Sequence, residues 1–329
     1  RELNPLNDLI AFLKICKLIA QEKPDIIHTH TAKAGTLGRL AGIFYNLLAG
    51  KRIKLIHTFH GHVFEGYFGR FKTRLFIFIE RFLAYFSSKV ITVSSAVKEE
   101  LVSLGISGSD KIKVIPLGLE LERFLELPFK EISRCLNIGI VGRLVPIKNH
   151  RLFLESAAKI LQDNPELDLR FKIIGDGELR VELEEFARKL NLGSAVEFSG
   201  WQKDLPAVYA DLDIVCLTSI NEGTPVSLIE AMASGKTVVA TDAGGVKDLV
   251  GAYFDGAEDG LEFIAGERGI ITKMPNVDSF SGALNFALRN EVTSKKMSAA
   301  GREFVREKFA KARLIKDIER LYEQVITLP

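Results

Sequence analysis

The chain is poor in cysteine and has no long apolar run. Its three cysteines, Cys16, Cys135 and Cys216, are odd in number and widely spaced among 329 residues. This pattern argues against a disulfide framework and against a CxxC metal site. No apolar run is long enough to span a bilayer and no signal peptide is visible, so we expect a cytoplasmic protein.

A strong excess of one charge is also absent. The formal net charge is +2, which gives no indication of a nucleic-acid partner. Residues 1–133 carry a charge of +6 and residues 134–329 a charge of −4. The basic first half suits an acidic or membrane-borne partner, and a solvated surface explains it equally well.

No dinucleotide-binding fingerprint, G-x-G-x-x-G, follows any expected strand. The nearest run is GDGELR at residues 175–180, in which Arg180 stands where the third glycine belongs. An NAD-dependent oxidoreductase is therefore the weakest of the enzyme classes considered.

Apolar residues make up 47% of the chain, enough for more than one core. In the first half, strands expected at 25–30, 54–59, 89–93 and 113–115 alternate with helices, which predicts a doubly wound parallel sheet. Such a sheet normally has a strand and a glycine turn ahead of its first helix. Neither is visible, so we expect that an N-terminal piece is missing.

The alternation restarts after an irregular stretch at 118–134. The sequence thus predicts an α/β protein with two Rossmann-like domains whose parallel sheets face across a cleft. The expected domains are residues 1–125 and 135–310, with a linker at 126–134 and a last helix at 311–329. Residues 251–269 are glycine-rich and acidic, and we expect them to be irregular.

One stretch of the second half, residues 213–248, carries most of the chemistry. Thr224 is a plausible N-cap and Pro225 fits the first turn of a helix that contains Glu230. Glu222 precedes that helix, so we expect both carboxylates to face one cleft. Carboxylates accept hydrogen bonds from sugar hydroxyls, and a helix N-terminus binds phosphate. The alternative is that Glu222 is solvated and that Glu230 only favours the helix dipole.

Two basic residues, Arg143 and Lys148, flank a short loop after the strand LNIGIV. In open α/β sheets, ligands sit at the carboxyl ends of the strands. Two fixed cations there would hold a diphosphate and stabilise it as a leaving group without a metal. Otherwise they are ordinary exposed basic residues.

Further loops after strands contain glycines and an aromatic residue. Gly175 and Gly177 would let the backbone approach a ligand closely, although a tight turn would use them as well. Trp201 either lines a base pocket or packs within the protein. The D-x-D of Asp211 and Asp213 precedes its strand, so we reject it as a metal motif.

The histidines of the first half follow two strands, in DIIHTH and LIHTFHGH. A zinc site is conceivable, but no cysteine and only Glu65 lie nearby, so we expect no metal. His60 is our candidate for contact with a sugar or an acceptor, and His57 is expected to point into the structure.

Residues 64–86 are dense in aromatic side chains, with arginines and a lysine between them. This segment either lies on an anionic membrane surface or forms a helix on the sheet with a basic outer face.

Taken together, these motifs resemble glycosyltransferase family 4, which has the GT-B fold. The similarity lies in NEGTPVSLIEAMASGKTVVATDAGG, GRLVPIKN, IIGDGELR, FSGW and HTFHG, in that order along nearly the whole chain. The resemblance implies transfer of a sugar from a nucleotide-sugar donor, most often a UDP-sugar, with retention of configuration and without a metal or other cofactor. It also implies a last helix that returns to the first domain.

The resemblance further implies roles for individual residues. Arg143 and Lys148 would hold the donor diphosphate, and Glu230 would bind the ribose hydroxyls. Glu222 would face the donor sugar, and Gly223, Thr224 and Pro225 would supply backbone contacts. His60 would sit at the sugar and the acceptor, a glycan or a lipid-linked molecule of envelope or exopolysaccharide assembly. A nucleotide-sugar epimerase and a non-catalytic sugar-nucleotide-binding protein are the alternatives.

Overall fold

The computed structural model of the protein describes residues 5–50, 52–61, 70–130, 135–252 and 262–327. It divides into two compact units, one formed by Arg1–Leu117 with Ala312–Pro329 and the other by Gly118–Lys311. Residues 118–130, which the sequence placed in an irregular stretch, therefore belong to the second unit.

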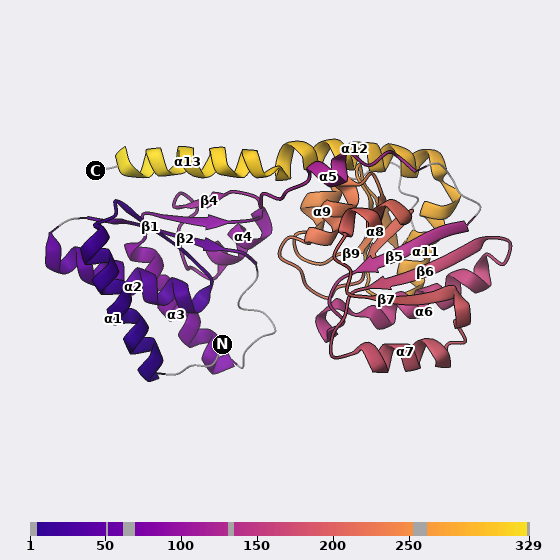
Figure 1. The fold of residues 1–329 in the computed structure, drawn as a ribbon, viewed down its shortest axis with the longest axis horizontal. Helices are drawn as coiled ribbons and strands as arrows, with labels where there is room; N and C mark the ends of the chain where they lie inside the picture. Colours follow the sequence, from indigo (N-terminus) through magenta and orange to yellow (C-terminus); the bar gives the residue numbers. More distant parts are fainter. Residues whose placement is uncertain (1–4, 51, 62–69, 131–134, 253–261, 328–329) are drawn as a thin grey trace. The chain divides into compact units, whose positions relative to one another are not determined.

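Within the described residues, the first unit contains a parallel four-stranded sheet of order β1-β2-β3-β4 (Figure 1). Its strands are β1 (Ile26–His30), β2 (Lys54–Phe59), β3 (Lys89–Thr92) and β4 (Ile112–Val114). Its helices are α1 (Pro5–Glu22), α2 (Ala32–Ala49), α3 (Arg70–Phe86), α4 (Ser95–Ser103) and α13 (Lys311–Thr327), which starts at the unit boundary.

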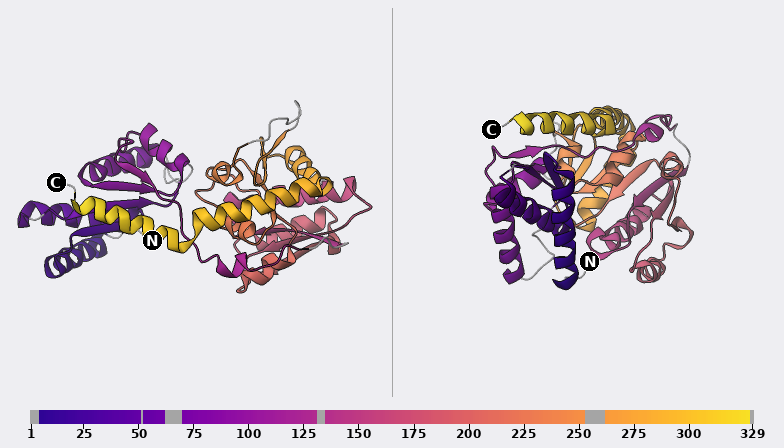
Figure 2. Two further views of the ribbon diagram at one scale, coloured as in Figure 1. Left: turned by 90° about the horizontal axis from the view of Figure 1, so that it is seen from above. Right: turned by 60° about the vertical axis from the view of Figure 1, so that its left-hand side comes forward.

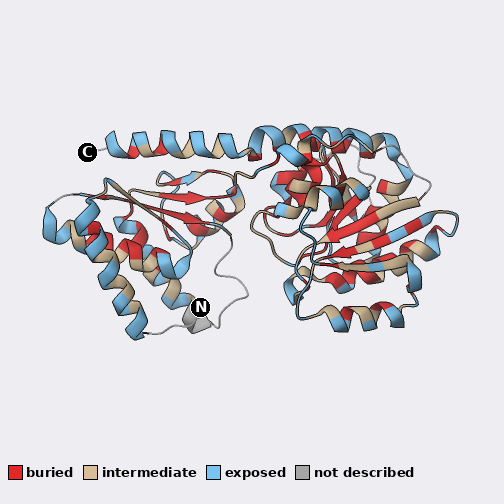
Figure 3. Cartoon of the chain, in the orientation of Figure 1, coloured by how far each residue is buried: buried red, intermediate tan, exposed pale blue. Residues whose placement is uncertain are grey.

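The two faces of this sheet are covered by different helices, because successive strand residues point to opposite sides. Leu55 packs among residues of α1, α2 and α3, whereas its neighbour Ile56 packs with Leu321 and Val325 of α13. Figure 3 shows buried residues, in red, on the strands of this sheet and on α13, and Figure 2 shows α13 beside the sheet in further views. The expected return of the last helix to the first domain is therefore observed.

The second unit is built on a seven-stranded sheet of order β10-β11-β9-β8-β5-β6-β7 among the described residues. All pairs are parallel except that of β10 with β11. Its strands are β5 (Cys135–Val141), β6 (Asp168–Ile174), β7 (Val196–Gly200), β8 (Ile214–Leu217), β9 (Thr237–Thr241), β10 (Phe263–Ala265) and β11 (Ile270–Thr272).

Helices pack on both faces of this sheet. They are α5 (Glu122–Leu125), α6 (His150–Asp163), α7 (Arg180–Lys189), α8 (Leu205–Asp211), α9 (Val226–Ala233), α10 (Val246–Val250), α11 (Val277–Arg289) and α12 (Glu291–Phe309), with 3₁₀ turns at Pro146–Lys148 and Gly193–Ala195. The main core joins β5, β6 and β9 to α6 and α11 through buried side chains such as Phe153, Phe171 and Phe280. The sequence thus builds a rigid sheet whose strands end in the candidate loops.

Two local expectations are wrong. The stretch 251–269, expected to be irregular, contains the short strand β10, which pairs antiparallel with β11. Thr224 is not the N-cap of α9, because that helix begins at Val226 and Pro225 occupies the cap position in extended backbone geometry. The proline ring fixes φ but does not force the helix to start at that residue.

Candidate functional site

The candidate donor residues lie on loops at the carboxyl ends of β5, β6, β7 and β8. Since these strands are parallel neighbours, their carboxyl ends meet at one edge of the sheet. This edge is where open α/β sheets bind ligands.

The structure brings Lys148 and Glu222 together. The Lys148 Nζ atom donates to Glu222 Oε1 at 2.5 Å, and the Ser219 hydroxyl donates to the same oxygen at 2.6 Å. Both side chains are mostly buried, with 24% of Lys148 and 13% of Glu222 exposed. Glu222 is therefore an ion-paired carboxylate and not a freely solvated one.

Hydrogen bonds to backbone carbonyls hold the two loops that carry this pair in place. The Ile220 amide donates to the Ile147 carbonyl at 2.9 Å, and the Thr218 hydroxyl donates to the Lys148 carbonyl at 3.0 Å. The Thr241 hydroxyl donates to the Ser219 carbonyl at 2.6 Å from the next strand. These bonds position the loops that carry Lys148 and Glu222.

The start of α9 leaves polar groups unsatisfied. The buried hydroxyl oxygen of Thr224 has no hydrogen-bond partner within the described part of the chain. No side chain caps the helix, and its first amides carry the positive end of the helix dipole. A phosphate or sugar oxygen placed here would satisfy these donors.

Glu230, inside α9, has a different partner from Glu222. The Tyr209 hydroxyl lies 3.0 Å from both Glu230 Oε2 and the Ser227 carbonyl oxygen. Burial raises the pKa of Glu230, and the Tyr209 hydrogen bond opposes that rise. The two carboxylates are thus oriented separately, and Tyr209 fixes the side chain of Glu230.

Gly175 and Gly177 are needed for contacts within the protein. A Cβ atom on Gly175, whose φ is +140°, would lie 1.9 Å from the Gly142 carbonyl oxygen. One on Gly177 would lie 2.5 Å from the Leu144 carbonyl oxygen. The two glycines therefore let the backbone pack closely against the Arg143–Lys148 loop and the residue before it.

Arg143 and Trp201 are solvent-accessible. The Arg143 guanidinium is exposed and has no ion-pair partner among the described residues. Trp201 is 73% exposed, so it is not packed inside the unit. Both side chains are free to contact a ligand.

The histidines cluster in the first unit, at the carboxyl ends of β1 and β2. His30 Nδ1 and His60 Nε2 are 2.9 Å apart, and His28 bonds Tyr322 and Thr58, each at 2.7 Å. His57 is buried, as expected, and its ring bonds the Thr29 hydroxyl at 2.8 Å. His62 lies outside the described residues.

Burial is the main cause that lowers the pKa of each of these histidines. Neighbouring imidazoles add to it for His28 and His60, and for His57 the charge of Arg39 adds to it before the imidazoles do. The pKa of His28 falls to about 4 and that of His57 to about 2. The pKa values of His30 and His60 are also lowered. The cluster is therefore uncharged near neutral pH, which suits hydrogen bonding to hydroxyl groups. In the described part of the chain, no group of three or more His, Cys, Asp or Glu is arranged to hold a metal.

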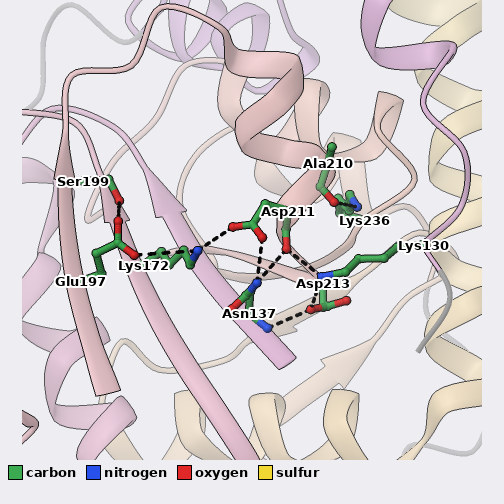
Figure 4. Close-up of polar contacts among 9 residues, drawn as sticks. All are labelled: Lys130, Asn137, Lys172, Glu197, Ser199, Ala210, Asp211, Asp213 and Lys236. Carbon is green, nitrogen blue, oxygen red and sulfur yellow. Dashed lines mark hydrogen bonds and ion pairs between the residues drawn. The ribbon is translucent and has the colours of Figure 1, made fainter. Parts of the chain in front are cut away.

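Asp211 and Asp213 lie at the opposite, amino-terminal edge of the second sheet (Figure 4). Asp213 Oδ2 accepts from Lys130 Nζ and from the Asn137 amide, each at 2.8 Å. Asp211 Oδ2 pairs with Lys172 Nζ at 2.6 Å. Both aspartates thus hold strands and helix ends together, which agrees with the rejection of a D-x-D metal motif.

Comparison with protein families decides the identity of the chain. Residues 136–304 match the model of the glycosyl transferases group 1, and residues 1–123 match that of Glycosyltransferase Family 4.

The chain belongs to the group 1 glycosyl transferases.

Similar proteins agree with this assignment. This glycosyltransferase is 31% identical over 294 residues to the UDP-Gal:alpha-D-GlcNAc-diphosphoundecaprenol alpha-1,3-galactosyltransferase of Escherichia coli, covering 86% of this chain and 71% of that protein. It is 24% identical over 327 residues to the putative glycosyltransferase EpsD of Bacillus subtilis, covering 96% and 80%.

Solved structures show the same fold. HepE of Anabaena in complex with UDP superposes with a TM-score of 0.77 at 20% identity, covering 95% of this chain and 82% of that one. A glycosyltransferase of Rickettsia africae also gives 0.77 at 20% identity, covering 100% and 84%. The glycosyltransferase therefore has the GT-B fold.

Three residues of the candidate site were missed from the sequence. Ser219 follows the strand end directly and could have been found by that position. Tyr209 lies in another helix, and no local pattern links it to Glu230. His150 is buried with both ring nitrogens lacking a partner in the described residues, and burial and Lys148 lower its pKa to about 4.

The aromatic helix α3 has an apolar outer face. Leu75, Phe78, Phe82, Tyr85 and Phe86 are exposed. The expectation of a basic outer face is therefore incomplete, because Arg74 and Arg81 accompany a larger aromatic surface. Residues 64–69 lie outside the described residues. None of the described helices is long and apolar enough to cross a membrane.

Proposed function

We propose that this glycosyltransferase moves a sugar from a UDP-sugar to a glycan or lipid-linked acceptor of envelope or exopolysaccharide assembly, with retention of configuration and without a metal. The observation that carries the donor site is the juxtaposition of Lys148, Glu222 and the unsatisfied start of α9 at one sheet edge. Together they offer a cation and backbone amides to phosphate and a carboxylate to sugar hydroxyls.

In the proposed reaction, the bond between the anomeric carbon and the diphosphate oxygen breaks, and a bond from that carbon to the acceptor oxygen forms. Arg143 and Lys148 stabilise the charge that develops on the leaving diphosphate. The acceptor proton passes to that diphosphate. Glu222 orients the donor sugar, Glu230 binds the ribose hydroxyls, and Trp201 contacts the base. On the first unit, His60 is assigned to the sugar and the acceptor.

The donor assignment is tested by calorimetric titration with UDP, GDP and ADP, each with and without EDTA. We expect EDTA-insensitive binding of UDP that is lost in Arg143→Ala/Lys148→Ala. The matched control is Lys203→Ala, which removes an exposed lysine of the same unit. Absence of nucleotide binding to the folded protein, or equal binding by the double variant, would overturn the assignment.

Retention and turnover are tested separately from binding. NMR of the product would show whether the new glycosidic bond keeps the anomeric configuration of the donor. Incubation with the donor alone separates transfer from epimerisation, since an epimerase needs no acceptor. Inversion of configuration, or epimerisation without an acceptor, would exclude this part of the proposal.

A lipid-linked acceptor is supported by two observations. The E. coli relative is named for a diphosphoundecaprenol substrate. The outer face of α3 combines exposed aromatic side chains with Arg74 and Arg81, a composition that suits an anionic membrane surface. Flotation with vesicles containing anionic lipid tests this, with neutral vesicles for comparison. Phe78→Ser/Phe82→Ser should reduce flotation, whereas exposed Val181→Ser on α7 should not.

A further inference from the structure

A cavity of about 350 Å³ lies at the amino-terminal edge of the second sheet. Its lining includes Leu136 near the start of β5, Ile214 at the start of β8 and Thr237 at the start of β9, closed by residues of α11 and α12. The donor loops follow the other ends of these strands. The cavity is therefore separate from the donor site, and its volume lies in the range of small-molecule sites, roughly 300–1,000 Å³.

Most of the cavity wall is apolar. The apolar lining side chains include Phe129, Leu136, Leu212, Ile214, Ala287 and Leu288. Such a wall favours a ligand with an apolar body, because binding removes apolar surface of both partners from water.

One lining residue, Lys236, is a buried cation that makes few polar contacts. It is only 2% exposed, and its Nζ atom donates to the Ala210 carbonyl at 3.3 Å (Figure 4). Lys236 forms no ion pair in the part of the chain that the structure describes. An ammonium group has three donors, so most of its hydrogen-bonding capacity is unused in a place where that is costly.

The other charges on the wall are already neutralised. Lys130 pairs with Asp213 at 2.8 Å, and Lys295 pairs with Glu291 at 2.7 Å. Both carboxylates are held by their own lysines. Asp213 and Asp211 act on Lys236 through their charge but form no ion pair with it among the described residues, so its ammonium keeps unused donors.

A second cation with unused hydrogen-bond donors, Arg302, lies behind the wall. Its guanidinium stacks on the Phe129 ring at 3.9 Å, and its Nη2 atom adjoins Gly235, where a Cβ atom would lie 2.6 Å away. Both Phe129 and Gly235 line the cavity. The Nε and Nη2 atoms of Arg302 are buried and find no acceptor among the described residues. The polar end of the cavity is therefore bordered by two cations, Lys236 and Arg302, whose donors are not all used.

We propose that this cavity binds a small organic anion with one carboxylate or phosphate group on an apolar body. The acid group meets the Lys236 ammonium, and the body lies against Leu212 and Ile214. The proposal is independent of the donor-site assignment.

Calorimetry with octanoate tests the proposal, with 1-octanol as the neutral match. We expect saturable octanoate binding at one site and much weaker binding of 1-octanol. Lys236→Met keeps the length of the side chain but removes the charge, so octanoate affinity should fall about tenfold or more, as for a lost charge-assisted hydrogen bond. Lys203→Met, an exposed lysine outside the cavity, should bind octanoate like the wild type.

The pH dependence gives a second readout. Burial, followed by the charge of Lys130, lowers the pKa of Lys236 to about 8. Octanoate affinity should therefore fall as pH rises from about 7 to about 9, a range in which exposed lysines keep their charge. The other charged groups that face this site are Lys130, Asp211, Asp213, Glu291, Lys295 and Arg302.

A third test fills the cavity and leaves Lys236 unchanged, so it remains informative if Lys236→Met does not fold. Ala299 is an exposed α12 residue on the cavity wall, and the adjacent Ala300 is exposed but not on it. Ala299→Leu should abolish octanoate binding and Ala300→Leu should leave it intact. Equal binding of octanoate and 1-octanol, no saturable binding, or equal binding by the two alanine variants would overturn the proposal.

Discussion

The Lys148 ammonium and the Glu222 carboxylate form an ion pair with atoms 2.5 Å apart. The cation proposed for the donor diphosphate is thus neutralised by the carboxylate proposed for the donor sugar. A bound diphosphate would compete with Glu222 for Lys148, so the two residues have opposite effects on nucleotide affinity.

Glu222→Gln removes this competition. We expect UDP affinity to rise a few-fold because Lys148 no longer has to leave an ion pair to bind the diphosphate, while sugar transfer falls because the sugar contact is lost. Lys148→Ala should lower UDP affinity about tenfold or more. Calorimetry and a transfer assay measure the two effects. Weaker UDP binding by Glu222→Gln would show that Glu222 supports the nucleotide and does not oppose it.

The buried pair of Arg39 and Glu80 should dominate the stability of the first unit. Arg39 is 0% exposed, and its Nη2 atom donates to both oxygens of Glu80 at 2.9 and 2.8 Å. Glu80→Ala leaves an uncompensated buried charge, which should cost about 3–5 kcal/mol in the free energy of unfolding.

Urea unfolding followed by circular dichroism measures that cost. The control is Glu303→Ala, which breaks the exposed pair with Arg306 and should cost less than about 0.5 kcal/mol. Similar losses in the two variants would mean that Arg39 finds another partner when Glu80 is absent.

The histidine cluster should make the first unit sensitive to acid. In the folded protein the pKa of His28 is about 4 and that of His57 about 2, whereas unfolded histidines titrate near about 6.5. The unfolded chain therefore binds more protons below that value. The free energy of unfolding should be unaffected by these groups above about pH 7 and should fall below it by about 1.4 kcal/mol per pH unit for each histidine.

Urea unfolding at several pH values between about 7.5 and 4.5 tests this dependence. His28→Gln removes one titrating group and should make the fall with acid shallower. An unchanged slope would show that His28 is protonated in the folded protein or that its titration is not linked to unfolding.

Gly175 should tolerate no side chain. Its φ of +140° is nearly restricted to glycine, and a Cβ atom would collide with the Gly142 carbonyl oxygen. Gly175→Ala should therefore cost about 2–4 kcal/mol and displace the loop that carries Lys148. Gly193→Ala is the control, because φ is +49° there and no atom lies within 4 Å of a Cβ, so about 1 kcal/mol is expected. Thermal unfolding of both variants checks the difference, and equal losses would count against the collision.

The sequence predicts the helices and strands better than it predicts which side chains contact one another. Alternating apolar strands and amphipathic helices locate both sheets, since their periodicity is local. The short strand β10 escapes detection because three residues among glycines carry too little pattern. Thr224 was misassigned because a Thr-Pro pair fits more than one way of starting a helix.

Contacts between residues that are far apart in the sequence cannot be predicted from local patterns. Tyr209 reaches Glu230 from a separate helix, and Lys148 meets Glu222 from a loop 74 residues away. The resemblance to a family places Lys148 and Glu222 at the donor, but their mutual contact depends on the packing of β5 beside β8. The fold and the loops are therefore readable from the sequence, whereas the charge state and orientation of the site residues require the structure.

The order in which the protein is synthesised matters for its first unit. Residues 118–311 are contiguous and hold every described strand of the second sheet. The first sheet emerges earlier, but the face that carries Ile56, Ile91 and Ile115 is covered by Leu321 and Val325 near the end of the chain. A chain that lacks α13 would therefore leave the face of the first sheet that carries Ile56, Ile91 and Ile115 open to water.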